Sequence, residues 1–240
     1  MSATARDFYG FTNTVSYARM VLATSIREPL PEESVSTLPP RHEAMVLIQH
    51  FLNRVFVVIP LFDEASFYAS VEAVFRQNYR KAAAFDVWCV RMVLAISCAL
   101  HSKKRWDRRY REGIAHLKTA LCEAEQVLHP GSIQSIQAMI LLVLYSMLDP
   151  RHLDSWNLIG MTSRIMVDLG LHQDPPRYPP ISKAKLELRR RIFWCVYTLD
   201  RYIAHQPIFS FSYLKYSTTD SHLDLHQLCK HEHSHFPTML

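Results

Sequence analysis

The segment "AFDVWCVRMVLAISCAL", residues 84–100, decides the fold class. Asp86 and Arg91 are its only charged residues, and apolar residues fill nearly every other position. A helix that is apolar on all sides has no face for solvent, so it is expected at the centre of a domain. A second such segment, "IQSIQAMILLVLYSML", residues 133–148, follows Ser132, which can cap its first turn. The sequence therefore predicts a domain built around two deeply buried helices.

Segments with apolar residues at helical spacing flank these two and predict the helices that cover them. They are residues 41–59, which end before Pro60, and residues 64–77, 114–128, 155–169 and 182–204. Asp63 and Asp154 stand where they can cap the second and fourth of these helices. No segment predicts a strand, and five glycines in 240 residues are few for a β-rich domain. The expected fold is all-α, a compact or superhelical stack of about seven helices without a significant sheet.

Changes in composition divide the chain into three parts. Residues 1–40 end in the proline-rich segment "REPLPEESVSTLPP", which is typical of a linker. The helical pattern then runs over residues 41–204. The apolar periodicity stops there, and residues 205–240 form a histidine-rich tail. We expect this tail to be poorly packed, because it offers little apolar surface to offset the ordering of its backbone.

The segment "DSWNLIGMTSRIMVDLGLHQD", residues 154–174, has an unusual glycine within its helical pattern. Trp156, Gly160 and Arg164 follow one another at steps of four residues and so lie along one face. Glycine inside a helix costs about 1 kcal/mol relative to alanine, so its presence asks for a reason. We expect another helix to cross too closely at Gly160 for a Cβ, with Trp156 covering the crossing.

The same segment ends in a stop signal. Gly170 fits the residue just beyond a helix end, where a left-handed backbone is needed. Leu171 would then fold back onto Met166, as in a Schellman motif. The interpretation of the whole segment is structural rather than catalytic.

The last predicted helix carries a set of charged residues: Glu187, Arg190, Arg191, Asp200 and Arg201. Glu187 precedes two of the arginines by three and four residues, so we expect a charged face that compensates itself. Asp200 follows aromatic and aliphatic residues and is expected to be partly buried, which requires a cationic partner. Arg164 is the first candidate for that partner and Arg191 the second.

A basic segment, "HSKKRWDRRYRE", precedes the helix at 114–128. Its cations are Lys103, Lys104, Arg105, Arg108, Arg109 and Arg111. Mixed with Trp106 and Tyr110, they fit a nuclear-localisation signal or a patch that binds phosphates. The alternative is a solvated loop followed by the first turn of a helix, since short basic runs are common. The net charge of +5 permits an acidic partner without demanding one.

Cysteine and histidine positions predict no cofactor for this chain. The five cysteines are far apart and form no C-x-x-C pair, which favours reduced thiols in a reducing, intracellular compartment. The strongest metal pattern lies in the tail: His222, His226, Cys229, His231, His233 and His235. We expect it to take up metal adventitiously, with a specific zinc site as the alternative.

No membrane segment is expected. The N-terminus "MSATARDFYG" lacks the hydrophobic stretch of a signal peptide. The longest apolar run, "AMILLVLYSML", is about half the roughly 20 residues of a membrane span. The sequence also lacks the phosphate-binding loops, the G-x-S-x-G elbow and the H-E-x-x-H pattern of common enzyme classes, so we expect no catalytic activity.

Four segments in this order resemble the fungal-specific transcription factor domain, the regulatory middle region of fungal zinc-cluster transcription factors. They are "LPPRHEAMVLIQHFLNRVFVVIPLFDEASF", "SIQAMILLVLYSM", "WNLIGMTSRIMVDLGLHQD" and "ELRRRIFWCVYTLDR". The resemblance covers about residues 38–204. It departs from the family in two ways. The six-cysteine zinc cluster that lies N-terminal to the domain in the family is missing, since the first cysteine here is Cys89. The tail, in addition, does not follow the family pattern.

The resemblance implies an all-α, non-catalytic regulatory domain that works in the nucleus. Its implied partners are the transcriptional machinery or a regulatory protein, and a homodimer stays open. Zinc and DNA would be bound only by a cluster that this chain lacks or that a partner supplies. Two other functions remain as alternatives: a helical scaffold for protein interactions, and a small-molecule receptor with a pocket between helices.

Overall fold

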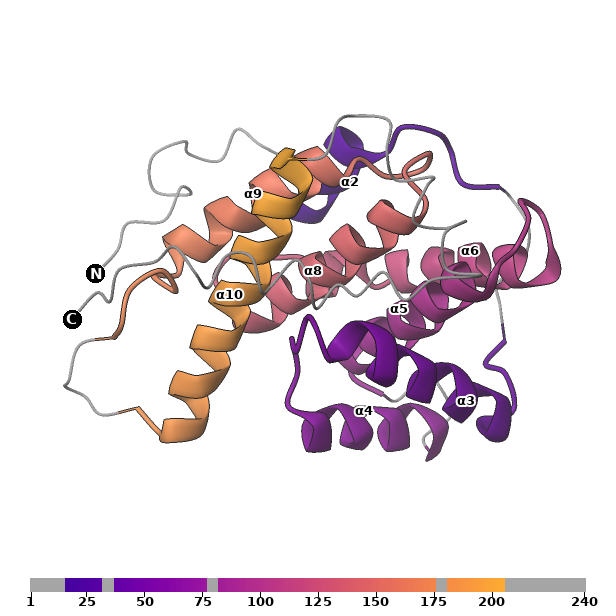
Figure 1. Ribbon diagram of the computed structural model, residues 1–240, viewed down its shortest axis with the longest axis horizontal. Helices are drawn as coiled ribbons and strands as arrows, with labels where there is room; N and C mark the ends of the chain where they lie inside the picture. Colours follow the sequence, from indigo (N-terminus) through magenta and orange to yellow (C-terminus); the bar gives the residue numbers. More distant parts are fainter. Residues whose placement is uncertain (1–15, 32–36, 77–81, 176–180, 206–240) are drawn as a thin grey trace.

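The computed structural model describes residues 16–31, 37–76, 82–175 and 181–205. The central pair of helices is α5 (Ala84–His101) and α8 (Ile133–Leu148), which pack against each other (Figure 1). Every residue from Val87 to Ala99 of α5 is buried, as is every residue from Ser135 to Ser146 of α8. The expected all-α fold with two buried central helices is confirmed.

Two groups of helices cover this pair. On one side, α3 (Arg41–Phe51), α4 (Glu64–Arg76) and α6 (Arg108–Leu121) pack on α5, and α3 continues into the π-helical segment η2 (Leu52–Phe56). On the other side, α9 (Ser155–Asp168) and α10 (Lys183–His205) pack on α8 and on each other. Figure 1 shows α10 running obliquely across α9, with its first turns on the side where α4 lies. The part of the chain that the structure describes contains no strand, only an isolated bridge between Ile26 and Leu153.

Helix caps explain where several of these elements begin. The Asp63 side chain accepts a hydrogen bond from the Ser66 amide, 3.1 Å away, before α4. Ser132 accepts from the Ser135 amide at 3.0 Å and caps α8. Asp154 accepts from two amides at the start of α9, at 2.9 and 3.2 Å. The three caps read from the sequence are therefore confirmed, because each polar side chain satisfies an amide that has no partner within its helix.

Two helices were not expected. α2 (Tyr17–Ser25) lies in the segment assigned to the N-terminal part and buries Ala18 and Val21 against α9 and α7. α7 (Ala124–Val127) separates from α6 because the helix breaks at Cys122 and Glu123. α2 has only nine residues and buries only Ala18, Val21 and Ser25, which is too few to give a clear helical pattern in the sequence.

The expected helix crossing at Gly160 is wrong. A Cβ built on Gly160 would meet no atom within 4 Å, and Trp156 is 61% exposed. The buried face of α9 consists instead of Leu158, Ile159, Thr162, Ile165 and Met166. The close crossing is at Gly113 of α6, where a Cβ would lie 3.3 Å from the Ala95 carbonyl oxygen of α5. A glycine inside a helix does allow a close helix crossing in this protein, but the glycine is Gly113 of α6 and not Gly160 of α9.

One helix among the described residues, α5, is long and apolar enough to cross a membrane. It is also the central helix of the domain, with 72% of that span buried by its neighbours. A buried core helix passes the same length and composition test as a membrane span.

Candidate functional site

The four segments that carry the family resemblance meet around the loop before α4. Leu61 and Phe62 of this loop are buried, so their carbonyl groups need donors from the protein. Gln137 of α8 donates to the Leu61 oxygen at 2.6 Å, and Arg191 of α10 donates to the Phe62 oxygen at 3.1 Å. Helices α8 and α10 thus both bind the loop before α4, and we call this arrangement the junction. It fixes the position of α10 relative to α8 and to the start of α4.

The end of α9 supplies the fourth side of the junction. Gly170 has a φ of +63°, and the Leu171 amide donates to the Met166 oxygen at 3.0 Å, as a Schellman motif requires. Arg189 of α10 donates to the Gly170 oxygen at 2.9 Å. The turn after α9 is thereby held against the first half of α10.

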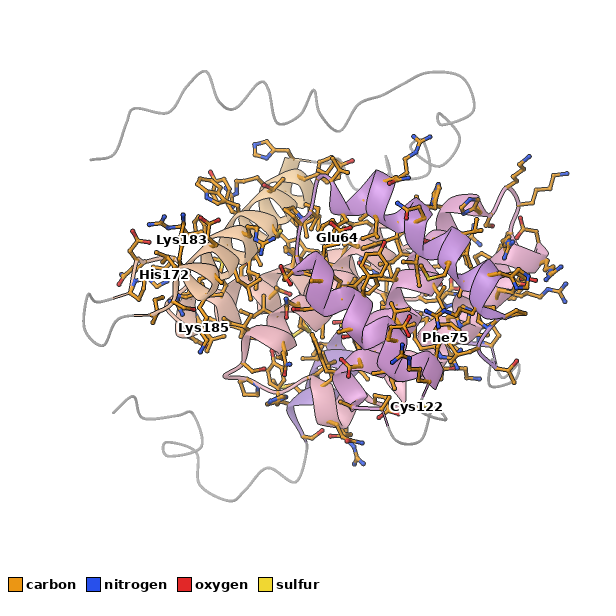
Figure 2. All side chains as sticks on the ribbon, turned by 90° about the horizontal axis from the view of Figure 1, so that it is seen from below. Glu64, Phe75, Cys122, His172, Lys183 and Lys185 are labelled. Atoms are coloured by element: carbon orange, nitrogen blue, oxygen red, sulfur yellow. The ribbon has the colours of Figure 1, made fainter. Side chains whose placement is uncertain are left out.

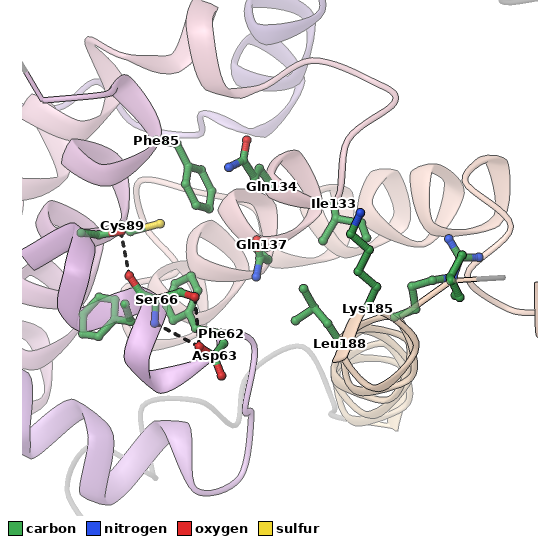
Figure 3. A pocket seen from close by; sticks show the side chains of 14 residues that line it. Phe62, Asp63, Ser66, Phe85, Cys89, Ile133, Gln134, Gln137, Lys185 and Leu188 are labelled. Atoms are coloured by element: carbon green, nitrogen blue, oxygen red, sulfur yellow. Dashed lines mark hydrogen bonds between the residues drawn. The ribbon is translucent and has the colours of Figure 1, made fainter. Parts of the chain in front are cut away.

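A cavity of about 500 Å³ lies beside this junction (Figure 3). It is bounded by the loop before α4, the first turns of α4 and α5, the start of α8 and the start of α10. Its apolar wall is formed by Phe62, Phe67, Phe85, Ile133, Ile181 and Leu188. The rings of Phe62 and Phe67 stack with their centroids 5.2 Å apart. A volume of this size is within the range of small-molecule sites.

Most polar groups in the cavity are already satisfied by the protein. The Ser66 hydroxyl donates to Asp63 at 3.0 Å, and the Ser70 hydroxyl donates to Asp86 at 2.7 Å. Hydrogen bonds from Ser66 lower the pKa of the Asp63 carboxyl, with a smaller contribution from the charge of Arg191. Burial raises the pKa of the Cys89 thiol well above its usual value, so this thiol lines the cavity as a neutral group.

Two cations from α10 line the same cavity, Lys185 and Arg189. Arg189 donates through Nη2 to the Gly170 oxygen, while its Nε is buried without a hydrogen-bond partner in the described part of the chain. Lys185 is exposed, and among the described residues its ammonium group has no hydrogen bond or ion pair. Figure 3 shows Lys185 extending from α10 toward the start of α8, where Ile133 and Gln134 lie. Sequence reasoning missed this lysine, because the spacing of cations along a helix does not say which of them faces a cavity.

The charged residues predicted for the last helix are arranged differently from the expectation. Arg190 pairs with Asp174, at 3.0 Å, and Arg191 binds the Phe62 oxygen, so neither arginine pairs with Glu187. Glu187 makes no direct ion pair with either arginine, but its charge contributes, after Asp174, to the raised pKa of Arg190, so the expected compensation acts through charge rather than through contact. α10 lies beside the turn after α9, which brings Asp174 to Arg190, and beside the loop before α4, where the buried Phe62 carbonyl needs a donor.

Asp200 is partly buried and has a cationic partner, as predicted, but the partner is Arg201. The pairing with Arg164 or Arg191 is wrong. Arg164 is exposed on α9, and Arg191 is occupied by the loop before α4. Arg201 also lies over the ring of Tyr197, 5.9 Å from its centroid.

The basic segment at residues 103–111 forms a turn and the first turn of α6. The Asp107 side chain accepts from the amides of Lys103, Lys104 and Tyr110, and so holds the turn closed. Within it, Trp106 has a φ of +65°, a conformation that bulky residues rarely adopt. Arg108 and Arg109 both pair with Glu112, at 2.7 and 2.9 Å. The patch is therefore partly neutralised, and its remaining cations are Lys103, Lys104, Arg105 and Arg111.

The metal pattern of the tail, His222 to His235, lies outside the described residues. Among the described ones, no group of three or more histidine, cysteine or acidic residues is placed to hold a metal ion. Cys89, Cys98 and Cys195 are buried free thiols, and Cys122 is an exposed one.

Comparisons with known proteins agree on one family. The model of the fungal-specific transcription factor domain matches residues 48–234, and so extends past residue 204 into the tail. A negative regulator of pleiotropic drug resistance, STB5 of Candida glabrata, is 26% identical over 179 residues, which cover 66% of this chain and 17% of that protein. An ABC-transporter-regulating transcription factor of Aspergillus fumigatus is 26% identical over 168 residues, covering 68% of this chain and 18% of that protein.

A third relative, pyrimidine pathway regulatory protein 1 of Saccharomyces cerevisiae, is 38% identical over 73 residues, covering 30% of this chain and 8% of that protein. The chain thus spans less than a fifth of each of these three relatives. No solved structure gives a significant match. Because the family model matches well over half of the chain and the relatives are fungal transcription regulators, the chain belongs to the fungal-specific transcription factor domain family.

Proposed function

We propose that this chain is the non-catalytic regulatory domain of a zinc-cluster-type transcription factor. In this proposal it modulates transcription in the nucleus at promoters that a separate zinc cluster selects. That cluster belongs to a longer form of the protein or to a partner, and the domain itself binds neither zinc nor any other cofactor. Its partners are the transcriptional machinery or a regulatory protein.

The observation that carries the proposal is the junction around the loop before α4. The segments that resemble the family are far apart in the sequence, and Gln137, Arg189 and Arg191 connect them by hydrogen bonds to backbone oxygens. Side chains that bind backbone at this point determine the relative position of α4, α8, α9 and α10. Such an arrangement suits a domain whose task is to hold a defined surface for a partner rather than to carry out chemistry.

A tethering experiment tests the proposal. The full 240-residue chain is fused to the DNA-binding domain of a bacterial repressor and expressed in yeast with a reporter gene behind the matching operator. We expect the fusion to change reporter transcription relative to the DNA-binding domain alone. Equal transcription with both proteins, at equal nuclear abundance, would contradict the proposal.

A matched pair of variants connects the readout to the junction. Arg191→Met removes the donor to the Phe62 oxygen, whereas Arg190→Met removes only the exposed ion pair with Asp174. We expect the first variant to abolish the effect on the reporter and the second to retain it. If both variants behave alike, the junction does not determine the activity.

A further inference from the structure

We propose that the cavity between α4, α5, α8 and α10 binds a small amphipathic acid, whose apolar body lies among Phe62, Phe85 and Leu188 and whose anionic group binds Lys185. The proposal concerns binding. Only its consequence, that such an acid would act as a signal to the domain, rests on the proposed function.

The apolar part of the inference follows from the wall of the cavity. Aromatic and aliphatic side chains from four separate elements point to one space of about 500 Å³. Ile181, at the rim, is 38% exposed although it is a large apolar residue. Apolar surface gathered around a hollow favours an occupant with an apolar body, because the occupant removes that surface from water.

The anionic part of the proposed ligand follows from which polar side chains in the cavity can still form a hydrogen bond to it. The Ser66 and Ser70 hydroxyls donate to Asp63 and Asp86, and the Gln137 amide donates one of its two N–H groups to the Leu61 oxygen, so each already has a partner in the protein. The Lys185 ammonium group is different, because it lines the cavity without a partner among the described residues. Lys185 is exposed to water at the mouth of the cavity, so its three donors are free to exchange water for the anionic oxygen of a bound acid.

The surrounding charge also favours an acid over an amine. Lys185 and Arg189 provide two positive charges in the lining, against the single carboxylate of Asp63. That carboxylate already accepts two hydrogen bonds from Ser66, which stabilise its negative charge without a cationic partner. An acid would therefore enter with its charge toward α10 and away from α4.

Three probes with the same ring system and different charges test this inference: naphthaleneacetate, naphthaleneacetamide and naphthylethylamine. Their dissociation constants for the full chain are measured by calorimetry at one pH and salt concentration. We expect the acid to bind about five- to tenfold more tightly than the amide, as for one charge-assisted hydrogen bond, and the amine to bind most weakly. Equal binding of acid and amide, tightest binding of the amine, or binding of none of the three would overturn the proposal.

Variants of α10 locate the anionic group. Lys185→Gln should weaken the acid to the affinity of the amide and leave the amide itself unchanged, which also shows that the protein is folded. Lys183→Gln is the matched control, since Figure 2 places Lys183 on the same end of α10 and it does not line the cavity. An acid affinity that is the same in both variants would show that the anion is not held by Lys185.

A blocking variant locates the apolar body. Gln134 is exposed at the start of α8 and lines the cavity, so Gln134→Trp should fill part of the space without disturbing the buried helix. We expect all three probes to lose affinity by about tenfold or more. An unchanged affinity for the acid would place the binding site elsewhere. These measurements do not involve transcription, so a failure here leaves the tethering experiment as an independent test.

Discussion

Gly113 and Gly160 illustrate how the same residue, inside a helix in both cases, can have opposite meanings. At Gly113 the backbone of α5 lies so close that a Cβ would be 3.3 Å from both the Ala95 oxygen and the Cys98 Cβ. At Gly160 the space is open. The sequence indicates that a glycine is present in each helix, but it does not indicate the direction that each glycine faces.

This difference gives opposite expectations for the same substitution. Gly113→Ala should destabilise the protein by roughly 1–3 kcal/mol, because the neighbouring backbone oxygen is buried and has little room to move. Gly160→Ala should stabilise it by about 0.5–1 kcal/mol through helix propensity. Urea unfolding midpoints of the two variants measure this directly. Shifts in the same direction would contradict the assigned packing.

Two histidines should make stability depend on pH. The pKa of His50 is lowered to about 4 by burial and by the nearby His101 and Arg54, and the pKa of His116 is lowered to about 3 by burial and by Arg91. Both groups bind protons more readily in the unfolded chain, so their contribution is complete above the ordinary value of 6.5 and is lost as the pH falls toward 4.

The free energy of unfolding should therefore decrease as the pH is lowered from about 7 to about 4. His50→Gln should make this decrease smaller, because it removes one of the groups that the unfolded chain protonates. His172→Gln replaces an exposed histidine and serves as the control. Identical pH profiles for His50→Gln and the wild-type chain would show that His50 does not contribute.

Helices are the scale at which the sequence was most informative. Caps at Asp63, Ser132 and Asp154 and the stop at Gly170 are local signals, so they mark the ends of α4, α8 and α9 without knowledge of the fold. The partners of α10 are not local. Arg189, Arg190 and Arg191 are consecutive, and only the position of α10 between two loops assigns each arginine a different acceptor.

The cap of α9 can be tested at this scale. Asp154 accepts from two amides of α9 and also pairs with Arg27, which follows α2, at 2.7 Å. Asp154→Ala should destabilise the protein by about 1–2 kcal/mol, as expected for loss of a cap. Asp174→Ala removes only an exposed ion pair with Arg190 and should cost less than about 1 kcal/mol. Thermal unfolding of both variants provides the comparison, and an equal loss would mean that the cap contributes nothing beyond its ion pair.

At the scale of the whole molecule, the fold class and the family could be predicted but the candidate site could not. Apolar segments such as 84–100 indicate burial wherever they occur, so they define the core. The cavity instead depends on how far the start of α10 stands from α4, and no single segment encodes that distance. Lys185 becomes notable only when α10 is placed over the cavity.

The cations of the basic segment that form no ion pair within the described residues predict how strongly the chain binds DNA and how this binding depends on salt. The cations of residues 103–111 that are not paired with Glu112 are Lys103, Lys104, Arg105 and Arg111. We expect the purified chain to bind DNA weakly and without sequence preference, with a slope of log K against log salt no steeper than about −4. Replacing Lys103 and Lys104 by Gln should reduce that slope by about 2. A sequence-specific footprint, or stoichiometric zinc after dialysis, would contradict the expectation that this chain lacks its own DNA-binding module.

The burial of α5 has an optical consequence. The chain has four tryptophans, and Trp88 in the second turn of α5 is fully buried, whereas Trp106, Trp156 and Trp194 are 47%, 61% and 57% exposed. Acrylamide or iodide should therefore quench three emitters readily and leave a blue-shifted component from the centre of the domain. Because Trp88 adjoins Cys89 in the wall of the cavity, that component provides an intrinsic spectroscopic reporter of the interior, and Trp88→Phe should remove it.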